Sequence, residues 1–133
     1  MTKLPRRPLV VAAILENEDG AVLIARVPST NGGTPFWQFP RGSVQADESA
    51  ESAVRRLTWS DMEIQVEIVT GQPPIVVTVD GIETELRYFF CDVIDGSPRT
   101  GMYSEFRWVA KAQLCEYDFD VHSTPVAHWL ESE

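Results

Sequence analysis

The sequence has little positive charge, few cysteines and no long apolar run. Lysine and arginine number 11 against 20 aspartates and glutamates, so the 133-residue chain carries a formal net charge of −9. This balance argues against a general polyanion-binding surface, and we expect no nucleic-acid partner. Any phosphate that the protein binds must therefore be held locally, by a metal ion or by a few arginines.

The scarcity of cysteine and of apolar runs also limits the class of protein. Cys91 and Cys115 show no Cys-x-x-Cys spacing and have no histidine at zinc-ligand spacing, so we expect two free thiols. No apolar run approaches the roughly 20 residues that a membrane span needs. The apolar residues 9–15 follow a basic N-terminus but lack the length and the cleavage site of a signal peptide. We expect one cytoplasmic domain over residues 1–133, without a membrane partner.

The pattern along the chain predicts an α+β domain. Residues 9–15 and 21–27 are apolar runs that flank an Asp19-Gly20 turn, which predicts a hairpin. Further strands are predicted over residues 36–40, 64–69, 75–79, 82–94 and 105–109, and a turn over residues 42–44. Helices are predicted from Asp47, as N-cap, to about Asp61 and over residues 124–130. The expected architecture is a mixed β-sheet sandwiched between two helices.

One stretch, residues 35–64, joins a short aromatic strand, a glycine-bearing loop, an acidic helix start and an amphipathic helix. Its Gly42, Glu48, Arg56, Asp61 and Ile64 match or nearly match a signature of fixed spacing. This stretch resembles the box of the Nudix family of MutT-like pyrophosphohydrolases. The resemblance implies the Nudix fold (α/β/α) and cleavage of a pyrophosphate linkage in a nucleoside triphosphate or another nucleoside diphosphate-linked substrate.

The resemblance also implies Mg²⁺ or Mn²⁺ as cofactor, bound by carboxylates that share one helix face. In this chain the three ligand positions are Leu57, Ser60 and Asp61, and shifting the helix by one residue either way recovers no acidic cluster. Asp61 is the candidate metal ligand, with Ser60 beside it through its hydroxyl or a water. An ordinary solvated acid is the other interpretation of Asp61. We expect weak hydrolysis or, as the alternative, a catalytically inactive Nudix-fold module that binds a nucleotide or a protein.

Three residues are candidate catalytic groups by the same resemblance. Arg56 occupies the arginine position of the box, where it would pair with Asp61 or face a phosphate. Asp61 is the remaining acid of the metal half of the box, by which we mean the three ligand positions 57, 60 and 61. Glu105 lies before the last predicted strand, where some members of the family carry a general base.

Four residues are candidate substrate contacts. Gly42 would form the turn before the helix, next to Arg41, and Arg26 resembles family positions that contact substrate phosphate. A surface charge at a strand end is the alternative for Arg26. Trp37 could stack on a base or belong to the core. The expected partner is a nucleotide-like small molecule, and a homodimer is considered beside a monomer.

Overall fold

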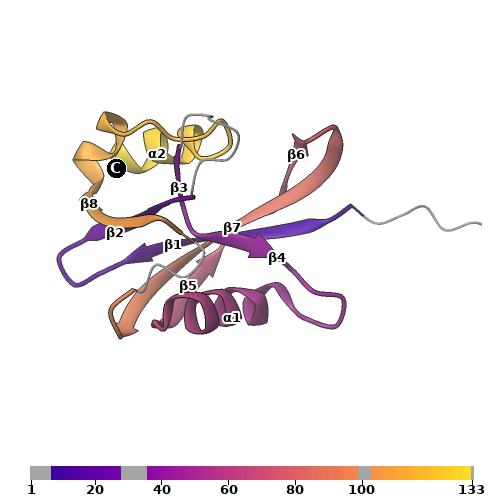
Figure 1. The fold of residues 1–133 in the computed structure, drawn as a ribbon, viewed down its shortest axis with the longest axis horizontal. Coiled ribbons are helices and arrows are strands. Elements are labelled where there is room, and N and C mark those ends of the chain that lie inside the picture. Colours follow the sequence, from indigo (N-terminus) through magenta and orange to yellow (C-terminus); the bar gives the residue numbers. More distant parts are fainter. Residues whose placement is uncertain (1–6, 28–35, 99–102, 133) are drawn as a thin grey trace, which may run out of the picture.

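A mixed β-sheet forms the centre of the computed structural model, which describes residues 7–27, 36–98 and 103–132 (Figure 1). Within those residues the sheet has eight strands, and its main order is β3-β2-β1-β7-β5. In addition, β4 pairs with β1, β6 with β7, and β8 with β2. The strands are β1 (Leu9–Glu16), β2 (Ala21–Arg26), β3 (Trp37–Gln38), β4 (Arg41–Ser43), β5 (Gln65–Gly71), β6 (Ile75–Val79), β7 (Ile82–Asp95) and β8 (Glu105–Ala110). The β1–β7 pair is parallel and the other pairs are antiparallel.

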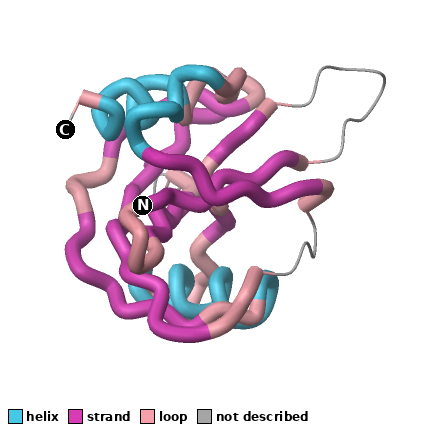
Figure 2. The backbone as a smooth tube through the Cα atoms, turned by 90° about the vertical axis from the view of Figure 1, so that its left-hand side faces the viewer, coloured by secondary structure: helices cyan, strands magenta, loops and turns pink. Residues whose placement is uncertain are grey.

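Helices cover both faces of this sheet. Helix α1 (Ala50–Met62) lies on one face, while the 3-10 helix η1 (Lys111–Glu116) and α2 (Thr124–Glu131) lie on the other (Figures 1 and 2). This arrangement confirms the predicted α/β/α architecture.

Two hydrophobic cores result, one on each side of the sheet. Successive side chains of a strand point to opposite faces, so β1 sends Val11 to the α1 core and Ala12 to the α2 core. Strand β7 divides its aromatic pair in the same way, with Phe89 in the α1 core and Phe90 against the α2 core. Both faces of the central strands are thus buried, which explains their almost continuous apolar sequence.

Three local predictions are wrong. Residues 42–44 are not a turn, because Gly42 lies in β4 opposite Val11 of β1. The N-cap of α1 is Ser49 instead of Asp47, and Ser49 Oγ accepts a hydrogen bond of 3.1 Å from the backbone N–H of Ser52. Glu105 does not lie in a loop before the last strand, because it is the first residue of β8, in agreement with the strand predicted over residues 105–109.

The expectations on cysteines agree with the structure. Cys91 is buried, Cys115 is exposed, and both are free. No helix within the described part of the chain is long and apolar enough to cross a bilayer.

Candidate functional site

Gly42 places the strand β4 directly against helix α1. A Cβ atom at this position would lie 3.4 Å from Leu57 Cδ1, at the edge of ordinary van der Waals contact. Because side chains alternate along a strand, the neighbouring Arg41 points to the opposite, α2 side of the sheet. The three residues of β4 therefore connect the box helix on one face with a pocket on the other.

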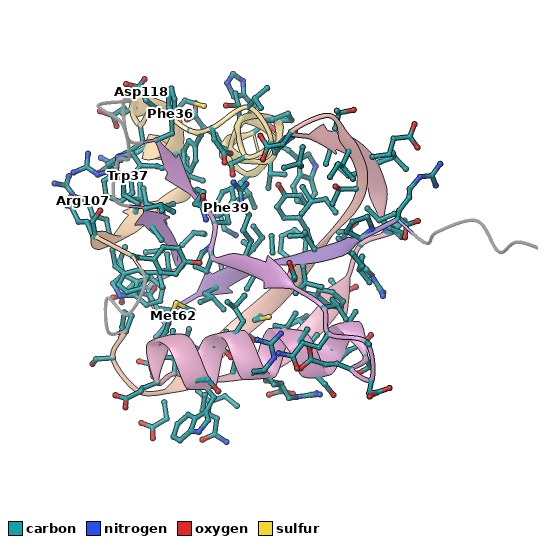
Figure 3. The ribbon with its side chains drawn as sticks, turned by 45° about the vertical axis from the view of Figure 1, so that its right-hand side comes forward. Phe36, Trp37, Phe39, Met62, Arg107 and Asp118 are labelled. Atoms are coloured by element: carbon teal, nitrogen blue, oxygen red, sulfur yellow. The ribbon has the colours of Figure 1, made fainter. Side chains whose placement is uncertain are left out.

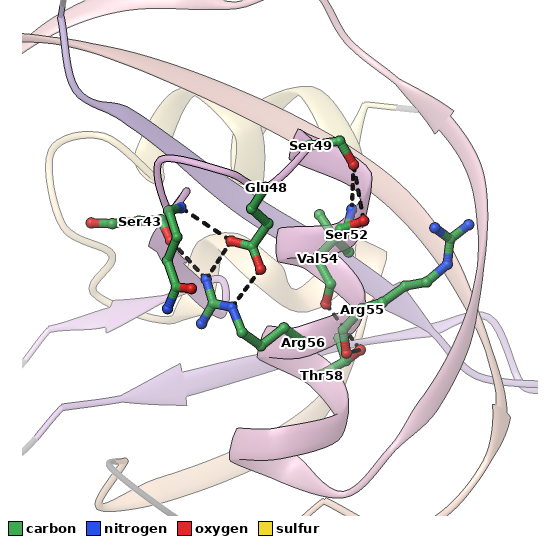
Figure 4. A network of polar contacts seen from close by, with 9 residues as sticks. Ser43, Glu48, Ser49, Ser52, Val54, Arg55, Arg56 and Thr58 are labelled. Atoms are coloured by element: carbon green, nitrogen blue, oxygen red, sulfur yellow. Dashed lines mark hydrogen bonds and ion pairs between the residues drawn. The ribbon is translucent and has the colours of Figure 1, made fainter.

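An ion pair closes the loop between β4 and α1 (Figure 4). Arg56 donates from Nε to Glu48 Oε2 at 2.7 Å and from Nη2 to Glu48 Oε1 at 2.9 Å, and Nη2 also donates to the Ser43 carbonyl at 2.9 Å. The hydrogen bonds from Arg56 lower the pKa of Glu48 below its ordinary value, and a hydrogen bond from the backbone N–H of Gln45 adds a smaller effect in the same direction. This bidentate geometry fixes the loop on the helix.

Two partners of Arg56 were not predicted from the sequence. Glu48 and the Ser43 carbonyl both hold the guanidinium. The side chain of Asp61 lies outside the described residues, so its predicted pairing with Arg56 and its predicted metal ligation stay predictions. Arg56 is here a positioning residue for the loop that carries Ser43 and Glu48.

Two of the three ligand positions of the box, Leu57 and Ser60, carry no carboxylate. Leu57 is only 2% exposed and packs beneath Gly42, while Ser60 is exposed in the last turn of α1. Among the residues that the structure describes, no group of three or more His, Cys, Asp or Glu side chains could hold a metal ion. A Nudix-type cluster of carboxylates therefore does not fit these residues, because the first ligand position is part of the packed core.

A second set of charged residues lies at the β2–β3–β8 edge of the sheet. Glu105 stands opposite Arg26 in the register of β2 and β8, and Arg26 Nη2 lies 2.8 Å from Glu105 Oε1. Arg107 Nε donates to the other carboxylate oxygen, also at 2.8 Å. To act as a general base, Glu105 would have to accept a proton from a water while both of its carboxylate oxygens are bound by these guanidinium groups.

The same two arginines both lie close to the ring of Trp37. Trp37 is 6% exposed, with the guanidinium carbon of Arg26 at 4.9 Å and that of Arg107 at 5.6 Å from its ring centroid. Figure 3 shows Arg107 beside Trp37. Tyr117 packs against the indole of Trp37 in a T-shaped arrangement, with 5.6 Å between the ring centroids. The buried indole of Trp37 leaves little surface on which a base could stack, whereas the adjacent Phe36 is 47% exposed.

Arg26 also carries an unused donor. Its Nε is buried and has no hydrogen-bond partner among the described residues. A buried donor of this kind costs free energy unless a ligand or water satisfies it. This is a physical reason to keep Arg26 among the candidate substrate contacts.

The α2 side of β4 holds a pocket of about 110 Å³. Its wall is mostly apolar and includes Val10, Val77 and Leu86. Its polar residues are Arg41, Thr84 and His122. Arg41 Nη2 lies 2.6 Å from Asp120 Oδ2, which orients the guanidinium. An apolar wall with few polar groups is common in small-molecule sites, but this pocket is smaller than their usual volume of about 300–1,000 Å³.

Two tyrosine hydroxyls bind the backbone of residues that line this pocket. Tyr88 donates to the His122 carbonyl at 2.9 Å, and burial raises the pKa of Tyr88 to about 12. The hydroxyl of Tyr103 accepts the backbone N–H of Arg41 at 3.2 Å. Sequence reasoning missed these residues and Asp120, because each acts through a contact with a segment far away in the chain.

Comparison with known proteins places this geometry in a family. A family model described as "NUDIX domain" matches residues 6–130. The chain belongs to the Nudix family. A MutT-like protein of Streptomyces ambofaciens is 34% identical to it over 123 residues, which are 92% of this chain and 76% of that protein.

Two further comparisons agree with the assignment. A CTP pyrophosphohydrolase of Escherichia coli K12 is 36% identical over 59 residues, 44% of this chain and 43% of that enzyme. A solved structure from work on MutT of Aliivibrio salmonicida and Vibrio cholerae superposes with a TM-score of 0.72 at 28% identity, covering 96% of this chain and 98% of that one. Nudix enzymes generally use divalent metal ions, so the core leucine at position 57 sets this member apart from the family signature.

Proposed function

We propose that this Nudix domain hydrolyses a pyrophosphate linkage in a nucleoside triphosphate or another nucleoside diphosphate-linked small molecule, at a low rate. The observation that carries the proposal is the preserved scaffold of the Nudix box, in which Arg56 binds Glu48 and holds the loop between β4 and α1. The partial match to a CTP pyrophosphohydrolase supports a nucleoside triphosphate as the first substrate class to examine.

The low rate follows from the residues that replace the metal ligands. Bound divalent ions would neutralise phosphoryl oxygens and activate the attacking water. Leu57 supplies no oxygen ligand, and Ser60 supplies only a neutral hydroxyl. Magnesium is often held by one or two carboxylates together with substrate phosphates, and Asp61 is the proposed carboxylate.

A second candidate function is binding without hydrolysis, as a nucleotide sensor or a protein adaptor. The specific observation in its favour is the burial of Leu57, which uses a ligand position for packing against β4. The Glu48–Arg56 pair and the Arg41 pocket persist in this case, because neither needs a metal ion.

Hydrolysis assays separate the two candidates. The purified chain is incubated with nucleoside triphosphates, dinucleoside polyphosphates and sugar nucleotides in Mg²⁺ or Mn²⁺, and released monophosphate and pyrophosphate are measured. We expect turnover below about 0.1 s⁻¹, under the usual range of about 1 to 1,000 s⁻¹. Asp61→Ala should abolish it, whereas the control Asp95→Ala, an exposed acid at the end of β7, should not.

Two other outcomes would contradict the proposal or a part of it. Nucleotide binding without turnover on any substrate would support the binding module and contradict hydrolysis. Turnover that survives Asp61→Ala would contradict the proposed role of that carboxylate.

A further inference from the structure

A second and larger cavity, of about 350 Å³, lies at the other end of the α2 face. Strand β1 contributes Val10 to the Arg41 pocket but Ile14 and Glu16 to this cavity. Val10 and Glu16 are about 20 Å apart along an extended strand. Among the described residues the two cavities share no lining side chain, so the second one is separate from the Arg41 pocket.

Aromatic side chains form one wall of this second cavity. Phe90 of β7 and Trp129 of α2 meet edge to face, with 5.5 Å between ring centroids and 66° between planes. Trp129 remains 48% exposed, although its neighbour Leu130 and Ala127 of the same helix are buried. Half of a large aromatic side chain is therefore available to a ligand.

A β-bulge shapes the part of the cavity that β5 lines. Ile68 and Thr70 of β5 pair with the consecutive Cys91 and Phe90 of β7, so Val69 is an extra residue. A bulge redirects side chains, and bulges are common next to functional sites. Here Val69 and Thr70 both line the cavity, and Val69 is 60% exposed.

The charges around this cavity are unbalanced. Lys111 Nζ lies 2.7 Å from Glu16 Oε1, so this lysine is matched by one carboxylate. Asp92 lines the same cavity and is exposed, and no ion pair holds it within the described part of the chain. One negative charge therefore remains beside an aromatic wall, in a chain whose net charge is already −9.

We propose that this cavity is a second ligand site, which takes a small organic cation with an apolar or aromatic body. Asp92 attracts the cationic group, and the indole of Trp129 adds cation–π attraction. Phe90, Val69 and Ile14 enclose the apolar part. The volume suits a compact ligand, since small-molecule sites span about 300–1,000 Å³. Anionic ligands are disfavoured by the excess carboxylate.

Three probes of nearly equal shape test the charge preference. The ¹⁵N-labelled full chain is titrated with 2-phenylethylammonium, the neutral 2-phenylethanol and the anionic phenylacetate, and amide and indole shifts are followed by NMR. The cation should bind about fivefold more tightly than the alcohol, and phenylacetate should bind most weakly. The largest shifts should fall on Val69, Asp92 and Trp129.

Matched variants locate the effect. Asp92→Asn should reduce the preference for the cation to less than about twofold, while Asp95→Asn, the same change three residues along β7, should keep it. Trp129→Ala should weaken both the cation and the alcohol, whereas Trp59→Ala, at an exposed tryptophan of α1, should weaken neither.

Four results would overturn the proposal. These are equal affinity for the three probes, no binding, shifts outside the cavity, or an unchanged preference in Asp92→Asn. The asparagine variant changes no packing in the core, so the test does not depend on Trp129→Ala remaining folded.

Discussion

Replacing Leu57 by alanine measures how firmly the first metal-ligand position of the box is built into the core. The side chain is 2% exposed and its Cδ1 faces Gly42 of β4. Truncation removes three carbon atoms and leaves a void between α1 and β4. Leucine-to-alanine changes at such positions lower the free energy of unfolding by about 2–5 kcal/mol, a large fraction of the roughly 5–15 kcal/mol typical of a domain.

Urea unfolding followed by circular dichroism gives this number directly. Leu57→Met conserves volume and should cost less than about 1.5 kcal/mol. Ser60→Ala, at an exposed position of the same helix, should stay within about 0.5 kcal/mol of the parent. A loss below about 1 kcal/mol in Leu57→Ala would refute the claim that packing has replaced metal ligation at this position.

Two other predictions concern the loop contacts. Arg56 lowers the pKa of Glu48 in the folded state, so the ionised carboxylate stabilises the fold above its ordinary pKa of 4.5. Glu48→Gln removes this stabilisation, and the difference in stability between the parent and the variant should vanish as the pH falls through the lowered pKa. Unfolding series of both proteins from about pH 7 to pH 3 check this. Gly96→Ala should cost about 2–3 kcal/mol by thermal unfolding, because φ is +97° and the new Cβ would lie 2.5 Å from the Glu63 carbonyl oxygen. Gly20→Ala, at φ +78° with open space, should cost only about 1 kcal/mol.

The elements that the sequence predicted are those with long, regular patterns. The apolar residues of β1 and β2 and the stripe of α1 at Ala53, Val54 and Leu57 specify their own burial. Strand β4 was missed because three residues are too few to show a period, and its pairing with β1 is a tertiary contact. The N-cap was predicted at Asp47 and not at Ser49 because aspartate and serine both cap helices well, so residue type alone does not distinguish them.

The candidate site was harder to predict, for a related reason. Its scaffold, Gly42 and Arg56, follows from spacing in one short segment. The partner of Arg56 does not, because Glu48 precedes the N-cap and reaches the arginine only after the loop folds back. Likewise Asp120 meets Arg41 across 79 positions of sequence, a contact that no local pattern indicates. Trp37 was left between base stacking and core, and its burial favours the core.

The central claim is that this Nudix domain keeps the scaffold of the box but has lost most of its metal half. Its most direct test is turnover by the Leu57→Glu/Ser60→Glu double variant in Mg²⁺ or Mn²⁺, beside a Trp59→Glu control that adds a carboxylate on another face of α1. The account predicts at least about a tenfold gain in hydrolysis, equivalent to roughly 1.4 kcal/mol of barrier, and no gain in the control. Parent activity already at the level of ordinary enzymes, with no gain in a folded double variant, would contradict it.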